Sequence, residues 1–343
     1  MSLARNLANL KPSSAGLIGA EDADTSLTQL FSFRNRIING DMRIDQRNAG
    51  AAVNSASGGS FAVDRFKSFG NSGGVYTTQR STDVPTGQGF VNSIVATVTT
   101  TDSPTGSDYY LITQEIEGFN FADLQWGSAS AKSVTLSFWV KSSLTGTYTA
   151  AFRNSALNRS YRAAYTINAA NTWEQKTITV PGDTTGTWLT DNGIGVRVGF
   201  TLGAGADFID TANMWSAVED FAATGQTQWI ATNGATFYIT GVQLEAGTVA
   251  TPFERRPYGT ELALCQRYFE TGYNRFRIDP FVSSGTTRPY AVVKRAAPTV
   301  TTSLVNGTIQ SIDAAYLSQF FVEFSASGLG GNCSFNFTAS AEL

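Results

Sequence analysis

Strand-length segments separated by glycine-rich turns fill this chain from residue 31 to about residue 255. They are rich in β-branched and aromatic residues, as strands are. The expected strands are 36–44, 75–80, 89–99, 109–116, 133–141, 147–154, 163–168, 173–180, 193–202 and 236–244. So many short strands at this spacing predict a β-sandwich or jelly roll. No repeat of 20 to 50 residues recurs, which argues against a β-helix or a propeller.

The 343 residues are enough for two domains, and residues 241–270 lie where they would join. We therefore expect an all-β protein with a jelly roll over residues 31–255 and a small antiparallel β-domain over 256–343. Residues 1–30 include a linker-like run and few large apolar residues, so we expect an extended arm. The last strand alternates cleanly, with one apolar face. That face comprises Cys333, Phe335, Phe337, Ala339 and Ala341.

Composition removes several classes of function. The chain has no histidine, which rules out Ser-His-Asp and Cys-His catalysis. Its net charge of −3 is unlike the basic surface of a nucleic-acid-binding protein. Cys265 and Cys333 both lie in apolar patterns and read as small buried hydrophobes, with a disulfide between them left open. No apolar run reaches the ~18 residues of a membrane helix, and no signal peptide is recognisable, so we expect maturation in the cytoplasm.

Two blocks of sequence resemble a known family. They are NRIINGDMRIDQRN at residues 35–48 and VQLEAGTVATPFE with YGTELALCQRYFE within residues 242–270. Both are similar to signatures of bacteriophage tail-fibre-like virion proteins. The pieces NGDM, TLSFWVK, TWEQKTITVPGD and FYITGVQLE are similar to jelly-roll carbohydrate-binding modules.

The resemblance implies a virion protein, assembled in the host cytoplasm and exported by lysis. It also implies that residues 1–30 attach the protein to other virion proteins, although a frayed terminus is the simpler reading. Fibre-like phage proteins are commonly trimeric, and a small C-terminal domain gains core by association, so we expect a homotrimer.

Alternation along two expected strands identifies candidate binding residues. In 194–203 the even positions are apolar and the odd ones are Gly, Arg197, Gly, Thr and Gly. In 134–141 the apolar set places Trp139 on the opposite, non-core face. Trp139 and Arg197 are therefore predicted to share a face cleared by glycine, where a sugar ring could stack and hydrogen-bond. The alternative is that Trp139 packs under a loop or against another subunit.

Trp188, Trp215 and Trp229 lie in expected loops and are further candidates for stacking on a sugar. The resemblance also raises the question of a calcium site, because carbohydrate-binding jelly rolls often hold a structural calcium ion. Asp41 stands where one ligand would be, but Thr240-Gly241 replaces the usual acidic pair. The sequence thus predicts no cofactor, with Asp41 as the remaining calcium candidate.

Three functions stay open. The first, favoured by both signatures and the composition, is adhesion to host surface polysaccharide as a tail-fibre or spike component, without catalysis. The second is a purely structural tail or capsid decoration protein. The third is a glycan hydrolase that uses two carboxylates. Acidic residues such as Glu115, Glu117, Asp207 and Asp210 are available for it, but scattered carboxylates of this kind are by default solvated loop residues.

Overall fold

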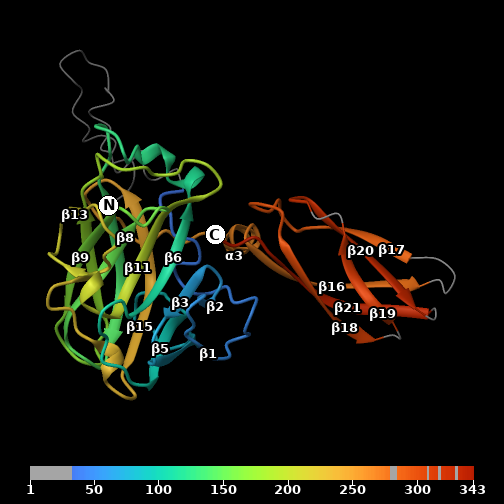
Figure 1. The fold of residues 1–343 in the computed structure, drawn as a ribbon, viewed down its shortest axis with the longest axis horizontal. Coiled ribbons are helices and arrows are strands. Elements are labelled where there is room, and N and C mark those ends of the chain that lie inside the picture. The colour runs from blue at the N-terminus through green and yellow to red at the C-terminus, as the bar shows by residue number, and fades with distance from the viewer. Residues whose placement is uncertain (1–32, 279–283, 307–308, 316–317, 329–330) are drawn as a thin grey trace, which may run out of the picture.

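The computed structural model describes residues 33–278, 284–306, 309–315, 318–328 and 331–343 (Figure 1). Within these ranges the regular structure is β-strand, apart from α3 (Tyr258–Gln266) and short 3-10 turns. The prediction of an all-β fold is confirmed. The predicted N-terminal arm, residues 1–30, lies outside the described residues. Over the described ranges, no helix has the length and apolar character needed to cross a bilayer.

Two antiparallel sheets form the jelly roll. Sheet A has the order β1 (Val53–Asn54), β4 (Val75–Ser81), β5 (Ser93–Thr100), β15 (Thr236–Ala246), β7 (Val134–Ser142) and β10 (Glu174–Val180). Sheet B has the order β13 (Trp215–Ser216), β9 (Ser160–Ile167), β8 (Gly146–Arg153), β11 (Ile194–Ala204), β6 (Tyr109–Glu117), β3 (Phe66–Gly70) and β2 (Ser60–Val63). Outside both sheets, β12 (Ile209–Asp210) pairs in parallel with β14 (Ala222–Ala223).

The main core lies between the two sheets, as the alternation predicted. Strand β7 contributes Val134, Leu136, Phe138 and Val140, and β11 contributes Val196, Val198, Phe200 and Leu202. The rings of Phe138 and Phe200 meet edge to face across the sandwich, 5.0 Å apart. Each such buried side chain stabilises the fold by about 1.5–3 kcal/mol relative to an exposed one. The residues between them on each strand consequently point outward.

The segment 36–44 is not a strand, contrary to expectation. Asn39 and Met42 adopt left-handed backbone angles, with φ of 60° and 59°, which a strand does not accommodate. The Asn39 side chain closes the turn by donating to the carbonyls of Ile44 and Asp64. Its backbone N–H donates to Glu261 on α3 at 2.5 Å. This asparagine therefore ties the start of the jelly roll to the helix that follows it.

The C-terminal unit comprises two three-stranded antiparallel sheets. One is β16 (Phe269–Ile278), β21 (Gly331–Ser340) and β18 (Thr299–Asn306), and the other is β17 (Ser284–Pro289), β20 (Phe321–Gly328) and β19 (Ile309–Ala315). Residues 290–294, which follow the end of β17 at Pro289, form no strand. Phe324 of β20 packs edge to face on Phe335 of β21, which joins the two sheets through a small core.

The predicted alternation of the last strand is confirmed, since Cys333, Phe335, Phe337, Ala339 and Ala341 are all buried. Both cysteines are buried and free. Cys265 packs against Tyr268 in a separate cluster from Cys333. The reading of both as small buried hydrophobes therefore holds, and the disulfide does not form.

Buried charges join the jelly roll to the C-terminal unit. Glu342 accepts hydrogen bonds from Arg47, at 2.5 Å, and from Arg65. The Arg65 guanidinium lies over the Tyr268 ring, 3.6 Å from its centre. The Tyr268 hydroxyl in turn donates to Glu117 of β6 at 2.8 Å. Ion pairs, a cation–π contact and a hydrogen bond therefore connect the two parts of the chain through a few buried side chains.

Candidate functional site

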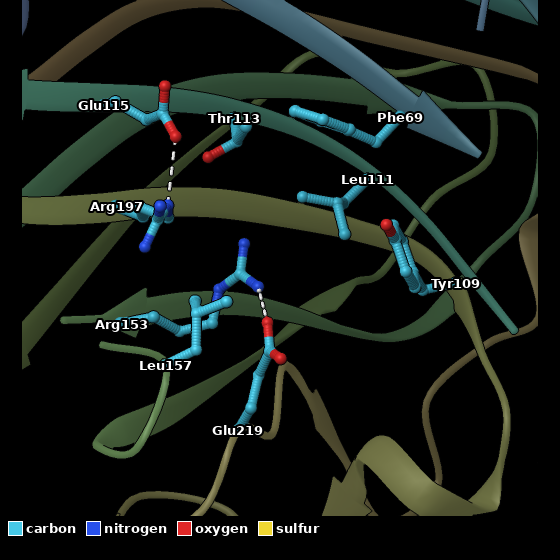
Figure 2. A pocket seen from close by; sticks show the side chains of 9 residues that line it. All are labelled: Phe69, Tyr109, Leu111, Thr113, Glu115, Arg153, Leu157, Arg197 and Glu219. Carbon is cyan, nitrogen blue, oxygen red and sulfur yellow. Dashed lines mark hydrogen bonds and ion pairs between the residues drawn. The ribbon is translucent and has the colours of Figure 1, made fainter. Parts of the chain in front are cut away.

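A pocket of about 190 Å³ lies on the outer face of sheet B. It crosses β3, β6, β11 and β8, so neighbouring strands supply most of its wall (Figure 2). We call it the sheet-B pocket. Its lining residues are Phe69, Tyr109, Leu111, Thr113, Glu115, Arg153, Leu157, Arg197 and Glu219.

One end of the sheet-B pocket is apolar. Phe69 on β3 and Tyr109 on β6 are half-buried there, with Leu111 beside them (Figure 2). Tyr109 is fixed from behind by edge-to-face packing on Phe221, with ring centres 5.4 Å apart. Phe221 itself stacks on Phe208 at 4.4 Å. The Tyr109 ring is thus held in place while part of its surface remains open to solvent.

The other end is charged and follows the strand register. Arg197 of β11 is the register partner of Glu115 on β6 and of Arg153 on β8. The Arg197 Nε donates to Glu115 at 3.0 Å, and its Nη1 donates to the carbonyls of Asn154 and Ser155 at 2.9 and 3.0 Å. Glu219, from the loop before β14, accepts from Arg153 at 2.5 Å. From Glu115 through Arg197 and Arg153 to Glu219, the side chains form a row of charges across the pocket. The signs in this row alternate except between the two arginines.

Neighbouring charges shift the pKa values of two pocket residues, Glu115 and Arg153. Burial alone would raise the pKa of Glu115, but Lys67, at 2.9 Å, and Arg197 outweigh it and hold that pKa below its usual range. Burial lowers the pKa of Arg153, and the neighbouring Arg197 lowers it further, against the opposing effect of Glu219. Glu115 is consequently a hydrogen-bond acceptor rather than a proton donor.

We assign Gly199 to the pocket floor from the position that a β-carbon would take there. It is the register partner of Thr113 and has the same parity along β11 as Arg197. A β-carbon at this position would lie 3.5 Å from the Leu111 Cδ1 and 3.6 Å from the Thr113 Oγ1, both lining atoms. The absence of a side chain here leaves room in the pocket. Gly195 and Gly203 differ, because a β-carbon there would come within 2.8 Å of Gly118 and 2.7 Å of Ile230.

Trp139 and Arg197 do not share a face. Each points outward from its strand as predicted, but β7 belongs to sheet A and β11 to sheet B. The core of the sandwich therefore lies between them, and the prediction of one common glycan face is wrong. Arg197 lines the sheet-B pocket, whereas Trp139 is half-buried on the far side. There Tyr238 of β15 shares the outer surface, with Lys141 over its ring at 4.2 Å.

The other candidate tryptophans serve as packing residues. Trp229 is fully buried in the main core and meets Tyr76 edge to face at 5.7 Å. Trp188 is buried against Trp126, with ring centres 4.8 Å apart. Trp215 is half-buried and packs on the same Trp126 at 5.1 Å. The prediction that Trp188 and Trp229 are exposed stacking platforms is wrong, because their loops fold back over the sandwich.

Asp41 faces a cation of the protein itself. Its carboxylate is 2.5 Å from the Arg43 Nε and is almost buried. Burial raises its pKa, although Arg43 opposes the shift. In the part of the chain that the structure describes, no three His, Cys, Asp or Glu side chains gather as a metal-ligand set. Asp41 therefore stands as one side of an ion pair.

Comparison with known proteins finds similarity among solved structures alone. No protein-family profile matches the chain, and no curated protein matches it in sequence. Among solved structures it is similar to the enzymatically active domain of bacteriophage CBA120 tailspike protein 4, at 15% identity and a TM-score of 0.32. That match covers 62% of this chain and 21% of the tailspike, so the chain spans about a fifth of its length.

Two further similar structures are sugar-binding proteins by name. One is a family 11 carbohydrate-binding module of a Clostridium thermocellum cellulase, at 13% identity, covering 60% of this chain and 98% of the module, with a TM-score of 0.29. The other is a putative sugar-binding protein from Bacteroides thetaiotaomicron, at 12% identity, covering 62% and 100%, with a TM-score of 0.35.

Proposed function

We propose that this protein is a phage virion component, of tail-fibre or spike type, whose jelly roll binds a host-surface glycan in the sheet-B pocket. The observation that carries the proposal is the composition of that pocket. An aromatic wall stands at one end and a row of ionised donors and acceptors at the other, within about 190 Å³. The virion role rests on the two sequence blocks that resemble tail-fibre-like proteins.

The chemistry of a pyranose ring matches this arrangement. Its C–H face packs on aromatic surface, which Phe69 and Tyr109 supply. Its hydroxyls both donate and accept hydrogen bonds, and the pocket offers the carboxylates of Glu115 and Glu219 beside the guanidinium of Arg197. The volume is below the ~300–1,000 Å³ of drug-sized pockets, which suits one sugar unit of a longer chain.

The environments of Glu115 and Glu117 favour glycan binding without hydrolysis. A glycosidase requires one carboxylic acid with a raised pKa, able to protonate the leaving oxygen. The pKa of Glu115 is held low by its two cationic neighbours. Glu117 is committed to the joint through Arg267 and Tyr268, at 2.6 and 2.8 Å. Release of reducing ends from host polysaccharide would contradict this part of the proposal.

The proposed partners are other copies of the chain, as a homotrimer, and other virion proteins contacted through residues 1–30. Light scattering at micromolar concentration tests the trimer, and a stable monomer would contradict it. Deleting residues 1–30 should leave the β-structure folded and abolish incorporation into particles. Normal assembly of the truncated chain would contradict the anchoring role.

A glycan array with purified protein tests the binding function. Wild type should bind at least one host polysaccharide, and Tyr109→Ala should lose that signal because it removes the aromatic wall. Tyr273→Ala is the matched control, since Tyr273 is exposed on the C-terminal unit. Equal loss in both variants would argue against the sheet-B pocket as the binding site, and an array without wild-type signal would favour a purely structural protein.

A further inference from the structure

We infer that the sugar unit bound in the sheet-B pocket is acidic, and that Arg153 and Arg197 together hold its carboxylate. This inference rests on the proposed function, because it names the class of glycan that the same pocket takes. Its basis is the one place where the row of charges across sheet B does not alternate.

Arg153 and Arg197 are direct cross-strand partners on β8 and β11. In an antiparallel pair such residues have β-carbons about 4.5–5.5 Å apart, and like charges at that spacing destabilise the sheet. Figure 2 shows the Arg153 guanidinium between Arg197 and Glu219. An anion received by both guanidiniums would turn this repulsion into attraction.

Hydrogen-bond donors remain free for such an anion. The Arg153 side chain is only 8% exposed, yet its Nε has no partner. Burying a guanidinium N–H without an acceptor is costly, so an acceptor that a ligand supplies from the adjoining pocket would stabilise this side chain. Arg197 uses Nε and Nη1 on Glu115 and two carbonyls, and none of the described residues accepts from its Nη2.

The charge count favours a group with a single negative charge. Among the lining residues, Arg153 and Arg197 balance Glu115 and Glu219. Lys67 pairs with Glu115 from outside the lining, and also donates to the Leu343 oxygen, so it adds one positive charge beside the pocket. A carboxylate balances this charge and matches the planar fork of a guanidinium. A phosphomonoester carries about −1.5 to −2 and would leave the pocket negative.

The rest of the pocket identifies the carboxylate as part of a sugar. Glu219 is partly exposed and carries a carboxylate oxygen beyond the one that accepts from Arg153, so it can accept from a ring hydroxyl. Tyr109 and Phe69 offer the apolar surface that a pyranose requires and a simple carboxylate does not. A uronic-acid residue within a polysaccharide combines all three features.

The test compares matched polymers on wild-type protein. Polygalacturonate, alginate and hyaluronan are each measured against their carboxyl-reduced forms by calorimetry. We expect at least one acidic polymer to bind tenfold or more tightly than its reduced form, and less tightly as salt rises. Equal binding of a reduced form, or no binding of any acidic polymer, would overturn the inference. A phosphodiester polymer such as teichoic acid that bound as tightly would also overturn it.

Variants locate the effect in the pocket. Arg197→Gln should reduce affinity for the acidic polymer at least tenfold, while Arg80→Gln on sheet A makes the same charge change outside the pocket and should have no effect. Equal losses would indicate general electrostatic attraction and overturn the inference. If Arg197→Gln does not fold, the wild-type comparison still decides. If the protein binds a neutral glycan and Tyr109→Ala abolishes that binding, the proposed function stands and the acidic sugar is ruled out. If it binds no glycan at all, the proposed function and this inference are both wrong.

Discussion

Replacing Gly199 with valine should fill the floor of the sheet-B pocket and leave the sandwich intact. The added β-carbon meets Leu111 and Thr113 at 3.5 and 3.6 Å, which are ordinary van der Waals contacts. The valine methyls then occupy space between those two lining residues. Glycine inside a strand costs about 0.5–1 kcal/mol relative to alanine, so the variant should be slightly more stable. For a domain of this size that corresponds to a rise in Tm of about 1–4 °C.

Binding should change in the opposite direction. A sugar excluded from the floor loses at least tenfold in affinity, or about 1.4 kcal/mol. Thermal melting and glycan affinity measured on the same preparation separate the two effects, because unfolding cannot explain weaker binding by a more stable protein. Gly73→Val is the control, since Gly73 is exposed in a loop with nothing within 4 Å of its added β-carbon. A lowered Tm with affinity retained would refute the assignment of the pocket floor.

Three further outcomes follow from the structure. Glu342→Gln should destabilise the protein by about 3–5 kcal/mol, because it leaves Arg47 and Arg65 buried without their shared carboxylate; an unchanged calorimetric Tm would contradict this. Trp139→Ala should lower the free energy of unfolding by less than the loss of about 3–5 kcal/mol that truncating a core tryptophan causes, and it should not alter glycan affinity. A loss of affinity would instead indicate that the glycan binds on sheet A. Burial raises the pKa of Asp64 from 3.8 to about 6, so stability present below pH 3.8 is lost as pH rises through 6. Asp64→Asn should flatten that decline in denaturant unfolding at pH 4 and 7, and an equal decline in both proteins would argue against it.

Local periodicity was sufficient to place most strands and to separate inward from outward residues. The alternation in 134–141 and 193–202 correctly assigned Phe138 and Phe200 to the core. Parity along one strand, however, says nothing about the sheet to which that strand belongs. Strand order is set by long-range pairing, and it placed Trp139 and Arg197 on opposite outer surfaces.

Only part of the pocket could be predicted from the sequence. Tyr109, Leu111, Thr113 and Glu115 occupy alternate positions of one predicted strand, so their common face could be read, but nothing local shows that this strand lies beside Arg197. The tryptophan predictions failed for the same reason. Trp126, Trp188 and Trp215 are far apart in the chain, and their mutual packing buries loops whose polar composition suggested exposure.

The joint between the jelly roll and the C-terminal unit has a mechanical consequence. Strand β16 leaves the joint directly after Tyr268, and β21 returns beside it, paired along its whole length from Phe269–Ser340 to Ile278–Gly331. The C-terminal unit extends away from the jelly roll beyond α3 (Figure 1). A pull on its far end would therefore travel through two strands loaded in parallel and reach Arg47 and Arg65 through Glu342. Because the two paired strands share the force, the C-terminal unit resists bending relative to the jelly roll. No single strand carries the whole force.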